Sequence, residues 1–376
     1  MAKPTLISLY SGCGGSALGF QNAGFEITYM NDNNADACYS LQENFEKKSD
    51  NPEREIVHRG NIKDVFDFGN ADVIEGGFPC QGFSLAGPRK VDDKRNVLYN
   101  YLKRTVMYAN PKFFVAENVK GFVTIGEKGK KKYFEDGKIA KLGDVAAAIK
   151  SELESTGAGY NVHCEILDAK DYGLSQDRQR IFIVGVRNDL DFKFEFPKPT
   201  HGPGNYVSME EYGIRGIPSL ETEVFRDKKE DREDYFSARY ISRNRIKKWN
   251  EVSYTIPAQA SQVPADPDSR HMWKIDKKDW WFELCLKMVK DDEWPEFRKN
   301  NSDKINPELR RLSWRQCAAI QGFPKDYKFE GDVRSIYRQI GNAVPPLLMQ
   351  RVAECIMPYF EGKESSFPMR KEKITA

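Results

Sequence analysis

Residues 5–20 read TLISLYSGCGGSALGF, and this stretch decides the fold class. Its apolar and β-branched start predicts a buried strand over residues 5–10, and SGCGG at residues 11–15 predicts a tight glycine turn. A helix is expected over residues 16–23, because Gly24 stops the pattern there. Such a strand-to-helix turn lets a ligand approach the backbone at the edge of a parallel sheet, although it can also serve packing alone. The spacing differs from G-x-G-x-x-G, so a dinucleotide fingerprint fits it poorly.

The amino-terminal half continues to alternate strand and helix signals, which is typical of an α/β protein with a parallel sheet. Further strands are expected at residues 26–30, 71–75, 112–119, 160–167 and 180–186. The last two are rich in β-branched and apolar residues and can pair with each other. The alternation is lost between about residues 188 and 307 and returns from 311 to about 359. Within the returning part, Ser313 and Gln316 have the spacing of a helix capping box.

Composition excludes several classes of protein. The chain has 376 residues, enough for two or three domains, and a formal net charge of +2, so a polyanion partner would need a local basic patch. Its seven cysteines form no CxxC pair, which argues for a reducing compartment and against a disulfide framework or a zinc site. The sequence contains no signal-peptide pattern and no apolar run of membrane-spanning length. A soluble, cytoplasmic protein without a membrane partner or a bound metal is therefore expected.

A second informative stretch is GGFPCQGFS at residues 76–84. Pro79 fixes its own φ and biases Phe78 toward an extended conformation. The backbone that connects the end of the strand to Cys80 is therefore expected to be rigid. A thiol held at the carboxyl end of a strand, beneath a loop, is suited to attack a substrate that must be enclosed. The alternative is a buried structural cysteine, and the motif alone does not decide between the two.

Other polar residues lie near predicted strand ends. Asp32 follows the glycine turn by about twenty residues, where a carboxylate can accept hydrogen bonds from ribose hydroxyls. Asn61 and Ile62 can border an adenine ring. Arg178 and Arg180 alternate along a predicted strand, so their side chains start on the same face; ordinary surface charges are the alternative.

Six blocks of sequence together resemble the DNA (cytosine-5) methyltransferase family. The blocks are LYSGCGGSALGFQNAG, GGFPCQGFS, AENVKGF, DYGLSQDRQRIFIVGVR, RLSWRQCAAIQGFP and YRQIGNAVP. They occur in the family's order and span nearly the whole chain, apart from a central variable region. The length resembles that of the stand-alone bacterial or phage enzymes of restriction–modification systems.

The resemblance implies a fold, a domain organisation and an activity. The fold is the α/β, Rossmann-like sheet of S-adenosylmethionine-dependent methyltransferases, seven-stranded and mostly parallel, with a smaller target-recognition domain. The expected domains are residues 1–188 for catalysis and cofactor binding, 189–305 for target recognition, and 306–376 returning to the catalytic domain. The implied activity is methyl transfer from S-adenosylmethionine to C5 of a cytosine flipped out of a short specific sequence in double-stranded DNA. The implied enzyme acts as a monomer and protects host DNA from a cognate restriction enzyme.

The resemblance also assigns the catalytic residues. Cytosine C5 is a poor nucleophile, and addition of the Cys80 thiolate at C6 would turn the ring into an enamine-like species. Charge that develops on the ring needs a donor at N3, and Glu117 fits this role because a carboxyl in a water-poor pocket should be partly protonated. Arg180 is expected to approach cytosine O2, with Arg178 orienting the acid or a phosphate. No side chain is an obvious base for the C5 proton, and water is a reasonable candidate.

For the cofactor, the resemblance places the methionine and sugar near the glycine turn, the ribose near Asp32 and the adenine near Asn61 and Ile62. The expected contact residues are Tyr10, Ser11, Gly12, Cys13, Gly14, Gly15, Asp32, Asn33, Asn61, Ile62, Pro79, Leu98, Asn342 and Ala343. Family members often have Glu at position 32 and an acid at position 61. These departures are expected to affect affinity more than the type of reaction.

DNA contacts are expected from two regions. A base can be reached only after it leaves the stack, so the loop after Cys80 should close against DNA. Residues 238–250 contain five basic residues and no acidic ones. This segment is a local basic patch suited to DNA, which the small net charge of the whole chain does not reveal. Its arginines suit guanine edges and its lysines suit phosphates. The expected DNA-binding residues are Gln81, Ser84, Arg89, Arg243, Arg245 and Lys247.

Two alternatives share part of this interpretation. A tRNA-acting member of the same family would keep the catalytic blocks, but the Cys-Phe-Thr segment characteristic of such enzymes does not occur in the sequence. A catalytically silent DNA-binding protein could keep the same scaffold. The intact set of Cys80, Glu117 and Arg180 argues against it, since a scaffold has no need of that trio.

Overall fold

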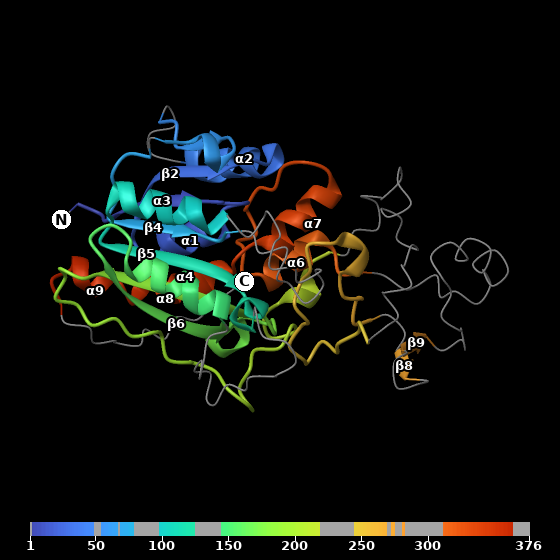
Figure 1. The fold of residues 1–376 in the computed structure, drawn as a ribbon. Coiled ribbons are helices and arrows are strands. Elements are labelled where there is room, and N and C mark those ends of the chain that lie inside the picture. Colours follow the sequence, from blue (N-terminus) through green and yellow to red (C-terminus); the bar gives the residue numbers. More distant parts are fainter. Residues whose placement is uncertain are drawn as a thin grey trace. The chain divides into compact units, whose positions relative to one another are not determined.

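The computed structural model describes residues 2–48, 54–66, 68–78, 98–124, 144–218, 244–268, 272–274, 280–282 and 311–363. The chain forms two compact units (Figure 1). The first comprises residues 1–172, 178–200 and 343–374, and the second comprises 173–177, 201–342 and 375–376. From the sequence, the carboxyl-terminal segment that rejoins the first unit is expected to begin at residue 306. In the division into two units, the segment that belongs to the first unit begins at Ala343.

A seven-stranded sheet of order β3-β2-β1-β4-β5-β7-β6 forms the centre of the first unit. The strands are β1 (Thr5–Leu9), β2 (Glu26–Asp32), β3 (Val57–Arg59), β4 (Val73–Gly76), β5 (Phe113–Val119), β6 (Tyr160–Asp168) and β7 (Gln179–Arg187). The first five strands pair in parallel, and β7 runs antiparallel to both β5 and β6. The predicted mostly parallel sheet and the predicted pairing of the two late strands are therefore confirmed. Strand β3 was not predicted, because three residues are too few to show a periodicity.

The strand order reverses between β1 and β4. From β1 the chain moves outward to β2 and β3, and then returns to the other side of β1 to form β4. In open α/β sheets, ligands bind at the carboxyl ends of the strands at such a switch point. The glycine turn follows β1 and the segment leading to Cys80 follows β4, so the topology brings both predicted site segments to this edge.

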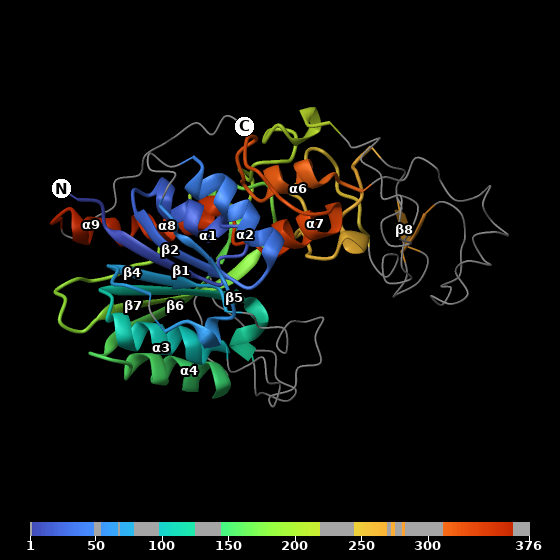
Figure 2. The ribbon, with the colours of Figure 1, turned by 90° about the horizontal axis from the view of Figure 1, so that it is seen from above.

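Helices cover both faces of the sheet (Figure 2). Helices α1 (Gly15–Asn22), α2 (Ala35–Leu41) and α8 (Pro346–Glu354) lie on one face, and α3 (Tyr99–Ala109) and α4 (Asp144–Glu154) lie on the other. Helices α1 and α8 touch through their backbones, since a Cβ atom on Gly19 would lie 2.5 Å from the carbonyl oxygen of Pro346. The late segment thus packs directly on the first helix. Shorter elements are η1 (Gln42–Glu46), η2 (Ile62–Asp64), η4 (Lys120–Thr124), η5 (Ala169–Tyr172) and α9 (Met357–Phe360).

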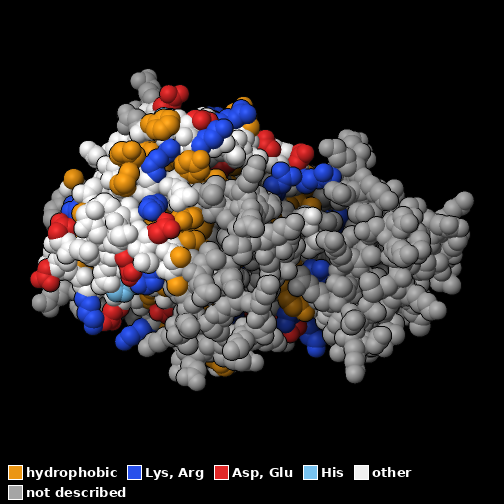
Figure 3. Space-filling model, viewed as in Figure 1, with side chains coloured by type: hydrophobic (Ala, Val, Ile, Leu, Met, Phe, Trp, Pro, Cys, Tyr) orange, Lys and Arg blue, Asp and Glu red, His pale blue; other side chains and the backbone are white. Residues whose placement is uncertain are grey.

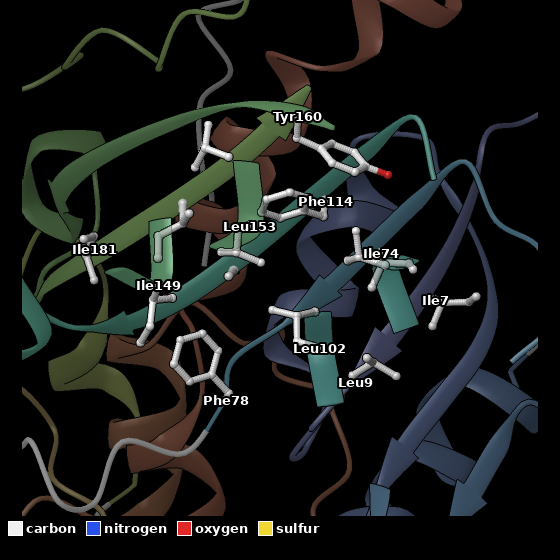
Figure 4. Packing of buried hydrophobic residues seen from close by; sticks show 14 of the residues in the cluster. Ile7, Leu9, Ile74, Phe78, Leu102, Phe114, Ile149, Leu153, Tyr160 and Ile181 are labelled. Atoms are coloured by element: carbon white, nitrogen blue, oxygen red, sulfur yellow. The ribbon is translucent and has the colours of Figure 1, made fainter. Parts of the chain in front are cut away.

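The core between the sheet and the α3–α4 layer is apolar (Figure 4). Ile7, Ile74 and Phe114 from three neighbouring strands belong to one buried cluster with Leu102 of α3 and Leu153 of α4. Each such side chain contributes about 1.5–3 kcal/mol by leaving water. Because side chains alternate along a strand, the residues next to these on β4 and β5 point to the opposite face, where α1 lies.

The second unit contains the capping box that the sequence predicted. Ser313 precedes α6 (Trp314–Ile320), its hydroxyl accepts a hydrogen bond from the Gln316 amide, and the Gln316 side chain accepts one from the Ser313 amide. Helix α7 (Val333–Asn342) packs closely at Gly341, where a Cβ atom would lie 2.3 Å from the Pro257 carbonyl. The other elements are η6 (Ile214–Gly216), η9 (Ala260–Gln262) and the antiparallel pair β8 (Met272–Lys274) and β9 (Trp280–Phe282).

Exposed hydrophobic side chains stand among charged ones on the face drawn in Figure 3. On any face of the described part of the chain, the large exposed hydrophobic side chains are Tyr39, Phe66, Met107 and Tyr108. The Arg104 guanidinium lies 4.9 Å from the Phe66 ring centroid and partly covers it. Single exposed hydrophobic residues of this kind are normal on soluble proteins. Within the described residues, no helix combines the length and the apolar character needed to cross a membrane.

Candidate active site

The glycine turn between β1 and α1 has left-handed backbone at several positions. Gly12 has a φ of 54° and Gly14 a φ of 88°, and the amide of Gly14 donates a 2.8 Å hydrogen bond to the Ser11 carbonyl. Tyr10 also has a φ of 54°, which is uncommon for a residue with a side chain. Among the described residues, a Cβ atom on Gly12 would meet nothing within 4 Å, so there is open space at this position of the turn. The turn can therefore receive a ligand beside the amino terminus of α1.

Asp32 ties the end of β2 to this turn. One oxygen of its carboxylate accepts a 2.9 Å hydrogen bond from the Gly12 amide, and the other accepts one of 2.9 Å from the Asn34 amide. Burial raises the pKa of Asp32, and the hydrogen bonds from these amides oppose the shift. Asn33 lies between Asp32 and Asn34 in the sequence, and its side chain is exposed. The predicted ribose ligand thus also shapes the turn.

The segment predicted to border the adenine is fixed by an arginine that sequence reasoning missed. The Asn61 side chain accepts a hydrogen bond from the Lys63 amide, and Ile62 is buried. Arg104 of α3 donates hydrogen bonds of 2.7 and 2.6 Å to the carbonyl oxygens of Ile62 and Val65. No local pattern reveals this contact, because its partners are about forty residues apart in the chain.

Further predicted cofactor residues are described at or near this turn. The hydroxyl of Tyr10 donates a 2.7 Å hydrogen bond to the carbonyl of Leu98, the residue before α3. Burial raises the pKa of the Cys13 thiol to about 12, so this thiol is neutral at physiological pH. Gly15 is the first residue of α1.

Glu117 and Arg180 form a largely buried ion pair on adjacent strands. Arg180 lies opposite Val119 in the register of β5 and β7, which makes it the diagonal neighbour of Glu117 on the same face. Its Nε atom is 2.9 Å from Oε1 of Glu117, and the two side chains are 14% and 12% exposed. Burial raises the pKa of Glu117, while the charges of Arg180 and Arg178 lower it. The pair places an acid with a shifted pKa at the carboxyl edge of the sheet, as a general acid requires.

Arg178 is almost wholly buried, with 1% of its surface exposed. Its guanidinium donates a 2.9 Å hydrogen bond to the carbonyl of Ala343, where the late segment rejoins the first unit. Its own amide donates a 3.1 Å hydrogen bond to the carboxylate of Asp168. Burial lowers the pKa of Arg178, the charge of Arg180 lowers it further and Glu117 raises it. Arg178 therefore connects the acid to the segment that precedes α8 through its charge and one hydrogen bond.

The end of β4 approaches Glu117. A Cβ atom on Gly77 would lie 3.4 Å from Oε2 of Glu117. The next residue, Phe78, accepts a 3.1 Å hydrogen bond at its carbonyl from the side chain of Asn118. Asn118 thus holds the backbone that leads into Pro79 and Cys80, and Glu117 lies beside it. A side chain at position 77 would contact this carboxylate, and glycine avoids that contact.

Comparison with known proteins decides the family. The sequence profile of the C-5 cytosine-specific DNA methylases matches residues 5–357. The chain belongs to this family. It is 35% identical to the Type II methyltransferase M.BspRI of Lysinibacillus sphaericus over 399 residues, which covers 95% of this chain and 82% of the relative. It is also 35% identical to M.BsuRI of Bacillus subtilis, covering 99% and 83% of the two chains.

Solved structures agree on the fold. The methylase superposes on the methyltransferase EhMeth of Entamoeba histolytica with a TM-score of 0.59 and 16% identity, covering 97% of this chain and all of the other. It superposes on the Dnmt2 methyltransferase of S. pombe with a TM-score of 0.56 and 18% identity, covering 96% and 99%. At these identities the likeness concerns the fold alone. Together with the family, it makes the chain a DNA (cytosine-5) methyltransferase with the fold of S-adenosylmethionine-dependent methyltransferases.

Several predicted site residues of the methylase lie outside the described residues. They are Pro79, Cys80, Gln81, Ser84, Arg89 and Arg243. Asn342 is the last residue of α7 in the second unit. The predicted roles of these residues stay predictions.

Two predicted DNA contacts of the methylase are described in the second unit. Arg245 is 5% exposed, and its guanidinium donates a 3.2 Å hydrogen bond to the carbonyl of Gln262, so base reading would require it to leave this contact. The Lys247 amine lies 3.4 Å from Glu251 and 4.9 Å from the ring centroid of Tyr254. Lys247 is half-buried, and part of its side chain can face a phosphate.

Proposed function

We propose that this enzyme methylates C5 of a cytosine rotated out of double-stranded DNA, through a covalent adduct between Cys80 and C6. One observation carries the proposal: the Glu117–Arg180 pair stands beside Gly77, three residues before Cys80. A thiolate and a proton donor are both needed on one cytosine ring, and Gly77, which precedes Cys80 in the sequence, lies beside the proposed donor Glu117. Glu117 would donate a hydrogen bond to N3, while Arg180 would balance the charge and approach O2.

The residues around the glycine turn fit S-adenosylmethionine. The open space at Gly12 and the amino terminus of α1, where the N-cap residue Gly14 makes no side-chain hydrogen bond, suit the methionine portion. Asp32 can accept bonds from the ribose hydroxyls, and Ile62 can face the adenine from a segment that Arg104 fixes. When bound, S-adenosylmethionine supplies an electrophilic methyl group on a sulfonium.

The work of the protein's own residues follows from their positions. Cys80 would add to C6 as a thiolate and leave again after C5 has lost its proton, for which water is the candidate acceptor. Glu117, whose pKa burial raises, would hold its proton toward N3 while negative charge develops on the ring. Arg178 would keep the start of α8 in place through Ala343. The enclosing protein would exclude bulk water, which strengthens each of these interactions.

The biological setting is proposed from the relatives. M.BspRI and M.BsuRI are Type II methyltransferases, and this chain covers more than four-fifths of each. We infer that it acts as a monomer on DNA and protects host DNA from a cognate restriction enzyme. Residues 189–305 would read the sequence, with Arg243 and Arg245 as base readers and Lys247 on a phosphate.

The test is bisulfite sequencing of DNA from cells that express the enzyme, compared with cells that express Cys80→Ser or Glu117→Gln. The proposal expects methylated cytosines at one short sequence with the natural chain and none with Cys80→Ser. Bisulfite sequencing of tRNA from the same cells serves as the second arm. Methylation confined to tRNA, or absent from both nucleic acids, would refute the proposal.

A further inference from the structure

Glu75 is a buried acid for which the proposed mechanism has no use. It is the third residue of β4, and only 1% of its surface is exposed. Ile74 belongs to the apolar cluster beneath the sheet, so Glu75 points to the other face, toward α1. There its two carboxylate oxygens accept hydrogen bonds from the hydroxyls of Ser8 in β1 and Ser16 in α1.

These two serines connect Glu75 to both ends of the glycine turn. The hydroxyl of Ser8 lies 2.8 Å from that of Ser11, the second residue after β1. Ser16 lies in the first turn of α1 and donates a 2.8 Å hydrogen bond to Glu75. The carboxyl group thus lies directly under the turn that would receive the methionine portion of the cofactor, separated from it by one hydroxyl on each side.

The position is costly for an acid. Burial raises the pKa of Glu75 to about 7, the hydrogen bonds from Ser8 and Ser16 oppose the shift, and the charge of Glu117 adds to it. None of the ion pairs within the described residues involves Glu75. A buried anion without a cationic partner is destabilising unless something compensates its charge. Ionisable groups whose pKa is strongly shifted are found more often at functional sites than elsewhere.

We propose that the Glu75 carboxylate makes the glycine turn prefer a sulfonium ligand to the uncharged thioether left after methyl transfer. This inference rests on the proposed function, since it takes the turn to be the cofactor site. The sulfonium would supply the cation that Glu75 lacks, and transfer of the methyl group removes that cation. Glu75 is then a specificity-determining residue that favours exchange of product for fresh cofactor.

Other ionisable groups surround the same site and must be separated from Glu75. Glu117 faces it from β5, Asp32 lies at the end of β2, and Cys13 lies in the turn itself. Ser8 and Ser16, from β1 and α1, carry no charge. A matched substitution is needed because the two other carboxyls also attract a cation. Glu75→Gln removes the charge and keeps the size, and Ser16→Ala removes one hydrogen bond and keeps the charge.

The experiment is titration calorimetry of the full chain with S-adenosylmethionine and with S-adenosylhomocysteine at pH 8. We expect Glu75→Gln to lower the preference for the sulfonium ligand by roughly threefold to tenfold, the size of one partly screened charge interaction. Ser16→Ala should weaken the binding of both ligands by the same factor and leave the preference for the sulfonium ligand unchanged. An unchanged preference in Glu75→Gln would overturn the inference and leave the proposed function standing. Failure of the natural chain to bind either ligand would overturn both.

A second measurement needs no substitution. At pH 7, calorimetry in buffers of different ionisation enthalpy counts the protons released on binding. A cation beside Glu75 favours its ionised form, so S-adenosylmethionine should release a fraction of a proton and S-adenosylhomocysteine should release less. Equal proton release with the two ligands would contradict the proposal.

Discussion

The side-chain amide of Asn118 donates a 3.1 Å hydrogen bond to the main-chain carbonyl of Phe78. Phe78 immediately precedes Pro79 and Cys80, and Asn118 immediately follows Glu117 in β5. The strand that carries the proposed acid therefore also holds the backbone that leads to the proposed nucleophile. This contact links two sequence blocks that lie forty residues apart.

We expect Asn118→Asp to lower kcat and, because position 118 is buried, to lower the free energy of unfolding as well. The aspartate keeps the acceptor that bonds the Val119 amide, but it cannot donate to Phe78 and repels its carbonyl oxygen. Displacement of a reacting group by about 1 Å can cost about a hundredfold in rate. Single-turnover methylation checks this, with Asn161→Asp on an exposed position of β6 as the control. Equal rates in the two variants would show that the contact has no catalytic role.

The Glu117–Arg180 pair predicts a dependence of rate on pH. The proposed mechanism needs a protonated Glu117, so the rate should fall as pH rises through its pKa. The charge of Arg180 lowers that pKa, and Arg180→Gln should move the fall to higher pH. Glu117→Gln should lower kcat by about 10²–10⁴-fold and remove the fall. Arg187→Gln, which loses a surface ion pair with Asp189, is the control. A fall that moves to lower pH in Arg180→Gln would contradict this assignment.

Asp32→Ala should weaken S-adenosylmethionine binding by about 1–3 kcal/mol, because charge-assisted hydrogen bonds to the ribose are lost. The substitution also leaves the amides of Gly12 and Asn34 without their acceptor, so the turn itself should loosen. Calorimetry measures the affinity and thermal unfolding measures the stability. Asp36→Ala, on the first turn of α2, is the control and should bind normally. Unaltered binding by Asp32→Ala would remove this residue from the site.

Gly19→Ala should destabilise the first unit. The added Cβ would lie 2.5 Å from the Pro346 carbonyl oxygen and 2.8 Å from the Gln350 amide nitrogen, so α1 and α8 must separate. Overpacking of this kind costs about 1–3 kcal/mol. Gly60→Ala is the matched control, since a Cβ there meets nothing within 4 Å. Denaturant unfolding should give a lower midpoint for Gly19→Ala alone, and similar midpoints would mean that the helices accommodate the methyl group.

Sequence reasoning worked where the signal is local. The strand, glycine turn and helix of residues 5–24 became β1 and α1, and the capping box at Ser313 formed as its spacing predicted. The pairing of β6 with β7 followed from two β-branched runs. Strand β3 was missed because its three residues show no period, and it is held in place by neighbours from elsewhere in the chain.

The candidate site could likewise be predicted from the sequence only in part. Residue types and family blocks indicated Glu117, Arg180 and Asp32, but not which groups they contact. The register of β5 and β7 sets Arg180 diagonal to Glu117, whereas the family resemblance assigns the orientation of the acid, or of a phosphate, to Arg178. Glu75 and Arg104 act through partners that lie about forty or more residues away, and such contacts become visible only when the sheet is assembled.

The central claim is that Cys80 attacks C6 of a cytosine in DNA. Its most direct test is mass spectrometry of the enzyme after reaction with S-adenosylmethionine and a cognate duplex that carries 5-fluorocytosine at the target position. Fluorine at C5 cannot leave as a proton, so elimination should stall. We predict a stable complex in which Cys80 is bonded to C6 of a methylated base, and none with Cys80→Ser. A complex that still forms in Cys80→Ser, or a methylated cytosine released without any adduct, would contradict the account.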